Sequence, residues 1–102
     1  MTDAATLNAT VRVRQLIDLT NRLTARLTEE SGVFESNRPQ DAAAALVGTQ
    51  DLANTYRRES AQLKADPTSI AAASAEDRAR LIQATTAFEA VLNRHARAVE
   101  AA

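Results

Sequence analysis

The side chains of this chain that could perform chemistry are few and do not gather into a reactive pattern. His95 is the single histidine and cysteine is absent, whereas a metal site needs several histidine, cysteine or carboxylate ligands that converge on one point. Val99, not a second ligand, stands one helical turn after His95. The sequence has no G-x-S-x-G turn and no glycine-rich phosphate loop. We therefore predict a protein that is not an enzyme, binds no metal and needs no cofactor.

The adjacent acids Glu29 and Glu30 come nearest to a paired-carboxylate site. Glu30 projects close to the apolar line of its helix, where a carboxylate must find a partner or stay hydrated. Three interpretations are open: a solvated or arginine-paired acid, a specificity contact to a partner, and general acid or base catalysis. For His95 we expect a partly buried helix position bonded to a neighbouring side chain, or else a pH-sensitive contact.

The basic residues do not form a phosphate clamp. Arg57 and Arg58, like Arg78 and Arg80, fan across different helix faces and have acidic neighbours. The net charge is −1, from 12 basic and 13 acidic residues, so no single-sign field attracts nucleic acid or anionic lipid. We expect no nucleic-acid partner. Tyr56, the only tyrosine, is expected in the core with its hydroxyl at the rim, or as an interface anchor.

The elements that position these residues are predicted to be helices, because the chain has 23 alanines, 10 leucines and 11 arginines against two glycines and two prolines. We predict a single helical domain over 1–102, with helices at about 5–36, 39–65 and 75–100. Ser36-Asn37-Arg38-Pro39 and Asp66-Pro67 separate them. The fold class is all-α: a long antiparallel helical hairpin plus a third amphipathic helix, in a three-helix bundle or coiled-coil-like arrangement.

Each segment carries a stripe at helical spacing. The first is Leu16, Leu19, Leu23, Leu27 and Phe34; the second, of smaller residues, is Ala42, Leu46, Thr49, Ala53, Tyr56, Ser60 and Leu63. The third is Leu81, Thr85, Phe88, Leu92, His95 and Val99, with spacings of four and three. A stripe this narrow is a seam for another helix. In the linker 68–73, Ile70 is expected to pin the chain to the bundle.

The core is expected to be small, because alanine makes up half of the apolar residues. The isolated chain should then be marginally stable, and burial against a client or a second copy would add stability. Residues 1–13 lack the apolar run of a signal peptide. No stretch approaches the ~20 apolar residues of a transmembrane helix. We expect a cytoplasmic protein without membrane insertion.

Five parts of the sequence carry a family resemblance: Leu23–Glu30, Arg38-Pro39 with Leu46, Leu52–Glu59, Leu63–Pro67 and Leu92–Ala98. They resemble the FlgN-like flagellar proteins, especially the alphaproteobacterial branch of that family. The match extends over about residues 16–102. It rests on a cadence of helical residues and contains no invariant chemical motif.

The resemblance implies a small cytoplasmic helical chaperone, which holds hook-filament junction (hook-associated) proteins for export through the flagellar type III apparatus. In that family the C-terminal helix engages the amphipathic end of the client. Carried onto this chain, this assigns client contact to Leu81, Ile82, Phe88, Val91, Leu92 and Val99. The alternative is a self-associating structural module, a homodimeric coiled-coil-like bundle without chaperone activity, in which the third helix closes the bundle or pairs with its copy.

Overall fold

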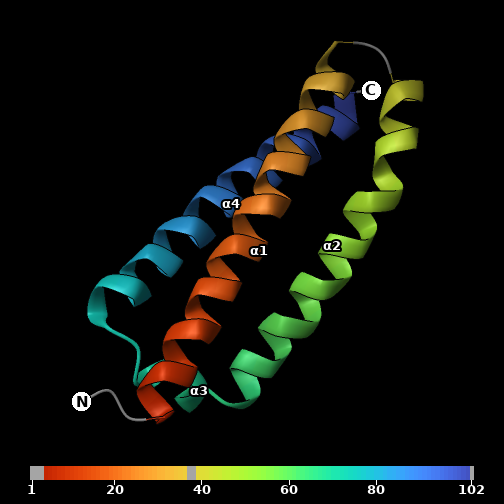
Figure 1. Cartoon of the computed structure of the whole chain (residues 1–102). Coiled ribbons are helices and arrows are strands. Elements are labelled where there is room, and N and C mark those ends of the chain that lie inside the picture. The colour runs from red at the N-terminus through yellow and green to blue at the C-terminus, as the bar shows by residue number, and fades with distance from the viewer. Residues whose placement is uncertain (1–3, 37–38, 102) are drawn as a thin grey trace.

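The computed structural model of the chain describes residues 4–36 and 39–101, and the side chains of residues 39–48 are not described. This part of the chain contains four helices and no strand (Figure 1). They are α1 (Ala4–Glu35), α2 (Pro39–Ala65), α3 (Thr68–Ala71) and α4 (Ala75–Ala101). The all-α prediction is confirmed. The molecule is a slender bundle with extents of 54 × 21 × 20 Å.

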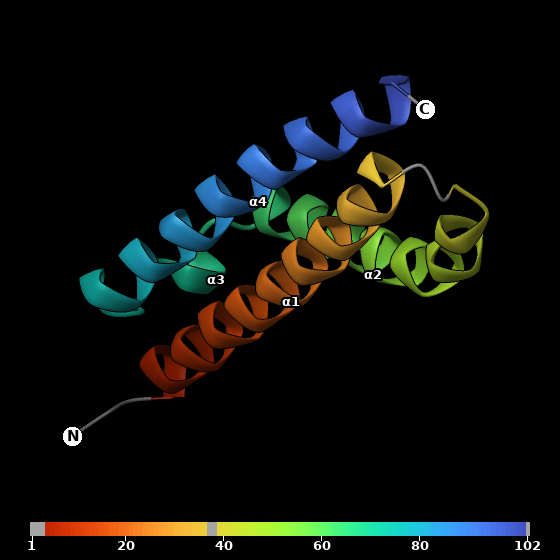
Figure 2. The same cartoon turned by 90° about the horizontal axis from the view of Figure 1, so that it is seen from above.

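Helix α1 organises the bundle, because it packs against all three other helices and most extensively against α4. Helix α2 runs antiparallel to α1, whereas α4 returns parallel to α1 (Figures 1 and 2). The hairpin and the third amphipathic helix are therefore present as predicted. The third helix does not extend away from the hairpin, since it lies along α1 and closes a three-helix bundle.

The linker between α2 and α4 is more ordered than the sequence suggested. Residues 68–71 form the short helix α3, which packs on α1. Ile70 contacts the cluster around Val13, as expected. Ser74 Oγ accepts a hydrogen bond of 3.1 Å from the backbone N–H of Asp77, which makes it the N-cap of α4. The expected turn at Asn37 and Arg38, and the side chains of Ala42 and Leu46, lie outside the described residues.

The seam between α1 and α4 has the spacing of a parallel coiled coil. Successive residues alternate by four and three on both helices, so that one face of each helix stays turned to the other. The buried or half-buried positions are Ala9, Val13, Leu16, Thr20, Leu23, Leu27, Glu30 and Phe34 on α1, and Asp77, Leu81, Ala84, Phe88, Val91, His95 and Ala98 on α4.

This seam differs from the stripe predicted on the third segment. Leu81, Phe88 and His95 lie on it, but Leu92 is 43% exposed and Val99 is 44% exposed, because both are rotated toward the flank of the helix. Alanines complete the seam instead, and their small side chains let the two helices lie close together. Large apolar residues dominated the sequence pattern, which hid the contribution of the alanines.

The predicted stripe on the first segment differs in the same way. The structure buries Ala9, Val13 and Thr20, whereas Leu19 is only half-buried and lines a hollow between α1 and α2. Thr20 lies within the seam, and its hydroxyl is satisfied because Oγ1 donates a hydrogen bond of 2.7 Å to the backbone carbonyl of Leu16. A buried hydroxyl of this kind is structurally acceptable because it is bonded.

Among the residues whose side chains are described, the apolar core forms two small clusters rather than one. The first lies near the start of α1 and α4 and comprises Ala9, Val13 and Ala73, with Ile17, Ile70 and Leu81 packed against them. The second lies where α1, α2 and α4 meet and comprises Leu23, Leu27 and Phe88, with Leu52, Ala53, Tyr56 and Val91 packed against them. Cores this small give a domain a narrow margin of stability.

Candidate functional site

The feature of the structure best suited to binding is a groove between α2 and α4. Among the described residues, the backbones of these two helices do not approach each other as closely as each approaches α1. Two hollows of about 200 Å³ and about 370 Å³ lie along this side of the bundle, and Tyr56 lines both. We call the two hollows together the α2–α4 groove.

Each of the three long helices contributes to the groove. Its floor is Leu16, Thr20, Leu23 and Leu27 of α1, its α2 wall is Ala53, Tyr56, Arg57, Ser60, Leu63 and Lys64, and its α4 wall is Leu81, Thr85, Phe88, Leu92 and His95. The rings of Tyr56 and Phe88 meet across the groove in a tilted contact, with their centroids 4.7 Å apart and their planes at 44°. The floor is therefore apolar and is crossed by one aromatic contact.

The structure distributes the six predicted contact residues over three environments. Phe88 and Val91 belong to the cluster shared by the three long helices, and Leu81 packs on the cluster near the start of α1. Leu92 lines the groove with its side chain partly exposed.

Ile82 and Val99 lie outside the groove, and Ile82 is 67% exposed. Of the six residues, Leu92 thus combines a place in the groove with a side chain that a partner can reach. The sequence stripe that led to it also contains Thr85, which lines the groove as well.

A buried acid lies at the end of the groove that His95 lines. Glu30 is 1% exposed, and its Oε2 lies 3.0 Å from Nε2 of His95. The two atoms share one hydrogen bond, and which of them donates depends on the tautomer of the imidazole. Glu30 Oε1 has no hydrogen-bond partner among the described residues. The rings of Phe34 and His95 meet edge to face, with their centroids 6.0 Å apart, and Phe34 thereby helps to cover the imidazole.

This arrangement decides the first of the three interpretations of Glu30. The acid is neither hydrated nor paired with arginine, because His95 is its partner on the facing helix. The expectation that His95 is a partly buried residue bonded to a neighbour is confirmed.

An exposed ion pair lies next to this buried pair. The guanidinium of Arg94 donates two hydrogen bonds, of 3.1 Å and 2.5 Å, to the two carboxylate oxygens of Glu35. These bonds lower the pKa of Glu35 below its ordinary value, and they raise the pKa of Arg94. The pair ties the end of α1 to α4.

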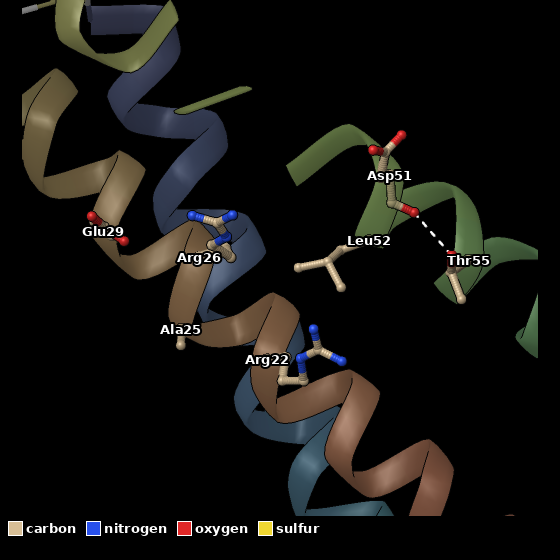
Figure 3. Close-up of a pocket in the computed structure, with 7 residues that line it drawn as sticks. All are labelled: Arg22, Ala25, Arg26, Glu29, Asp51, Leu52 and Thr55. Atoms are coloured by element: carbon tan, nitrogen blue, oxygen red, sulfur yellow. Dashed lines mark hydrogen bonds between the residues drawn. The ribbon is translucent and has the colours of Figure 1, made fainter. Parts of the chain in front are cut away.

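A second, more polar hollow of about 490 Å³ lies on the other side of α2, between α1 and α2 (Figure 3). Arg22 projects from α1 toward α2, and Leu52 points back toward α1 (Figure 3). Arg22 lies 4.0 Å from Asp18 on its own helix. The lining mixes both signs of charge, with Arg26, Glu29 and Asp51 among its residues. It lacks the continuous apolar floor of the α2–α4 groove.

The sequence did not indicate that the α1 residues of the groove floor belong to a binding site. The sequence pattern indicated that Leu23 and Leu27 are core residues, and the structure places both in a core cluster. Because α2 and α4 are separated, both residues also lie at the bottom of a hollow. A signal was present in the weak second stripe, because small residues such as Ala53 and Ser60 cannot fill the space beside α4.

The side chains and helices of the described residues bear on two other kinds of site. No group of three or more histidine or acidic side chains is arranged there to hold a metal ion. None of the helices in that part of the chain has the length and apolar character needed to cross a bilayer.

Comparison with known proteins gives one informative result. No model of a known protein family matches the chain, and no solved structure is similar to it. A relative from Caulobacter vibrioides, the flagellar basal-body protein FlbY, is 47% identical over 98 residues. The alignment covers 96% of this chain and 66% of FlbY, so the chain spans just under two thirds of the length of that relative. Over nearly all of its length, this chain is a homologue of a flagellar basal-body protein.

Proposed function

We propose that this chain is a flagellar assembly protein that holds an amphipathic helix of another flagellar protein in the α2–α4 groove. In the finer form of the proposal, the helix belongs to a hook-associated protein, and the chain holds it as a chaperone until export through the type III apparatus. The protein acts by binding and not as an enzyme.

The observation that carries the proposal is the shape and lining of the groove. From Ala53 to Lys64 its α2 wall spans 12 residues, and the two ends are about 16 Å apart along the helix. A partner helix of roughly three turns has the same length. An amphipathic helix that lays its apolar face into such a groove is a common mode of peptide recognition. The partner would complete a four-helix bundle.

Leu92 and Tyr56 are the contacts we assign to the partner, and Phe88 supports them from below. Leu92 stands on the α4 wall with 43% of its surface exposed, and docking would cover it. Val99 lies two turns beyond Leu92 on the same flank of α4 and extends the contact for a longer client helix. Phe88 is 7% exposed and already packed, so its contribution is to shape the floor.

Two sequence relationships support the flagellar assignment. The relative in Caulobacter vibrioides is named a flagellar basal-body protein, and the cadence of residues along the chain resembles the FlgN-like proteins. The first relationship supports a flagellar role, and the second supports the narrower role of export chaperone. FlbY is longer than this chain, so the alignment covers only part of it. That the two proteins share a client site is therefore itself part of the proposal.

The test is calorimetric titration of the purified protein with peptides from the C-terminal helices of hook-associated proteins. We expect saturable binding that Leu92→Asp abolishes, since the substitution places a charge in the apolar groove. Leu7→Asp is the matched control, because Leu7 is 56% exposed on α1 and does not line the groove. Absence of binding, or equal loss in both variants, would contradict the proposal. A stable dimer in sedimentation, dissociated by Leu92→Asp, would favour the self-associating module instead.

A further inference from the structure

The charged side chains that line the α2–α4 groove are basic. Arg57 and Lys64 line its α2 wall and His95 lines its α4 wall, whereas no acidic residue is among the groove-lining residues. Two acids near the groove are engaged elsewhere: Glu30 is buried behind His95, and Glu59 forms an ion pair with Arg12 of α1. On the α2 side, the apolar floor is therefore bordered by positive charge.

Neither Arg57 nor Lys64 has an ion-pair partner among the described side chains. Arg57 donates a hydrogen bond of 3.0 Å to the side-chain oxygen of Asn54, a neutral group on the same helix. Lys64 forms no ion pair with any described residue. The ion pairs that are present join other residues, such as Arg12 with Glu59 and Arg94 with Glu35. Both side chains are exposed. The border of the groove thus keeps two basic groups available to a partner.

From this border we infer that the occupant of the groove is an acidic amphipathic helix, with its apolar stripe flanked by carboxylates on the side that faces α2. The inference rests on the proposed function and adds the charge of the partner to it. Arg57 and Lys64 are seven residues apart, about 10.5 Å along one face of α2. Two acids spaced by seven residues on the partner helix match that separation.

The test compares three helical peptides that share one apolar face and carry glutamate, glutamine or lysine at the two flanking positions. Their affinities for the intact protein are measured by fluorescence anisotropy at low and at high salt. We expect the glutamate peptide to bind about three- to tenfold more tightly than the glutamine peptide, and the lysine peptide most weakly, as two exposed ion pairs allow. High salt should compress these differences.

Charge reversal identifies the residues responsible. The double variant Arg57→Glu/Lys64→Glu should invert the order of the glutamate and lysine peptides. The matched control, Arg58→Glu/Arg97→Glu, changes the net charge equally at exposed positions outside the groove lining and should leave the order unchanged.

The outcomes separate the inference from the proposed function. If all three peptides bind equally at low salt, the acidic partner is refuted while binding of a helix stands. If none binds, the proposed function itself fails. If the control variant inverts the order as well, net charge and not the groove border selects the partner, which also overturns the inference. The comparison on the unmodified protein keeps the test decisive even if the reversed variant does not fold.

Discussion

Replacement of His95 by leucine should destabilise the fold, because it removes the described partner of a buried carboxylate. Glu30 is 1% exposed, its Oε2 bonds to His95 at 3.0 Å, and its Oε1 has no partner among the described residues. A hydrogen bond to a charged group contributes about 1.5–3 kcal/mol, and removing one member of a buried pair costs about 3–5 kcal/mol. The new leucine packs in the seam and offsets part of this. We expect a net loss of about 2–3 kcal/mol for His95→Leu, from these ranges.

The double variant should behave in the opposite way. Glu30→Leu with His95→Leu places apolar residues at facing positions of the α1–α4 seam and removes the buried polar pair. Replacing a buried pair by apolar side chains of similar volume is often neutral, or stabilising by about 1–4 kcal/mol. The double variant should therefore be at least as stable as the unmodified protein, although His95→Leu alone is less stable.

Urea unfolding followed by far-UV circular dichroism measures all four members of this cycle at neutral pH. The predicted coupling energy between positions 30 and 95 is about 2 kcal/mol or more, since the cost of losing His95 depends on the presence of the carboxylate. Effects that add within about 0.5 kcal/mol would show that the two side chains do not act together. A His95→Leu variant as stable as the unmodified protein would refute the buried-pair reasoning outright.

Three further predictions concern the fold. Gly32→Ala should stabilise the protein by about 0.5–1 kcal/mol in urea unfolding, because Gly32 is helical and an added Cβ would meet no atom within 4 Å; a loss would contradict this. Ala84→Leu should cost about 1–3 kcal/mol by overpacking the seam, and an unchanged midpoint would argue against close contact there. Arg94→Ala should raise the pKa of Glu35 toward its ordinary value, as observed by carboxyl NMR titration. Since the folded pKa is lowered, the ion pair stabilises above the unfolded pKa of about 4.3 and this contribution is lost as pH falls through the folded value. A stability difference between the two proteins that persists at lower pH would be inconsistent with the pair.

The helices themselves could be predicted from sequence, because the signals for them are local. Alanine and leucine favour helix throughout, Pro39 and Asp66-Pro67 interrupt it, and Ser74 caps α4. The observed bounds of α1, Ala4–Glu35, are shifted by one residue from the expected 5–36. Helix α3 was not anticipated, because a four-residue helix held by Ile70 depends on contacts with α1 and not on local sequence.

The orientation of α4 could not be predicted in the same way. Its stripe of large residues suggested one seam through Leu81, Phe88, Leu92 and Val99. The structure turns the helix so that Ala84, Val91 and Ala98 face α1. The choice between two adjacent stripes depends on how closely α1 can approach, and alanine favours close approach without adding to apparent hydrophobicity. Pairing between helices, rather than the pattern on either one, decides the seam.

The candidate site was predicted in part. Tyr56 was singled out as a core residue or interface anchor, and it lies at the junction of the two hollows. Leu92 was predicted as a contact, and it lines the groove. The floor residues Leu23 and Leu27 were not, because only the separation of α2 from α4 makes them part of a groove. That separation follows from small side chains on α2, a weak signal in a single sequence.

The central claim is that the α2–α4 groove takes up a helix of another flagellar protein. Its most direct test is amide chemical-shift mapping by NMR on the full chain during titration with a C-terminal helix of a hook-associated protein. We expect the shifts to concentrate at Tyr56, Lys64 and Leu92, while those of the exposed α1 residues Leu7 and Val11 stay unchanged. Shifts confined to α1 around Leu7, or no shifts at saturating peptide, would contradict it.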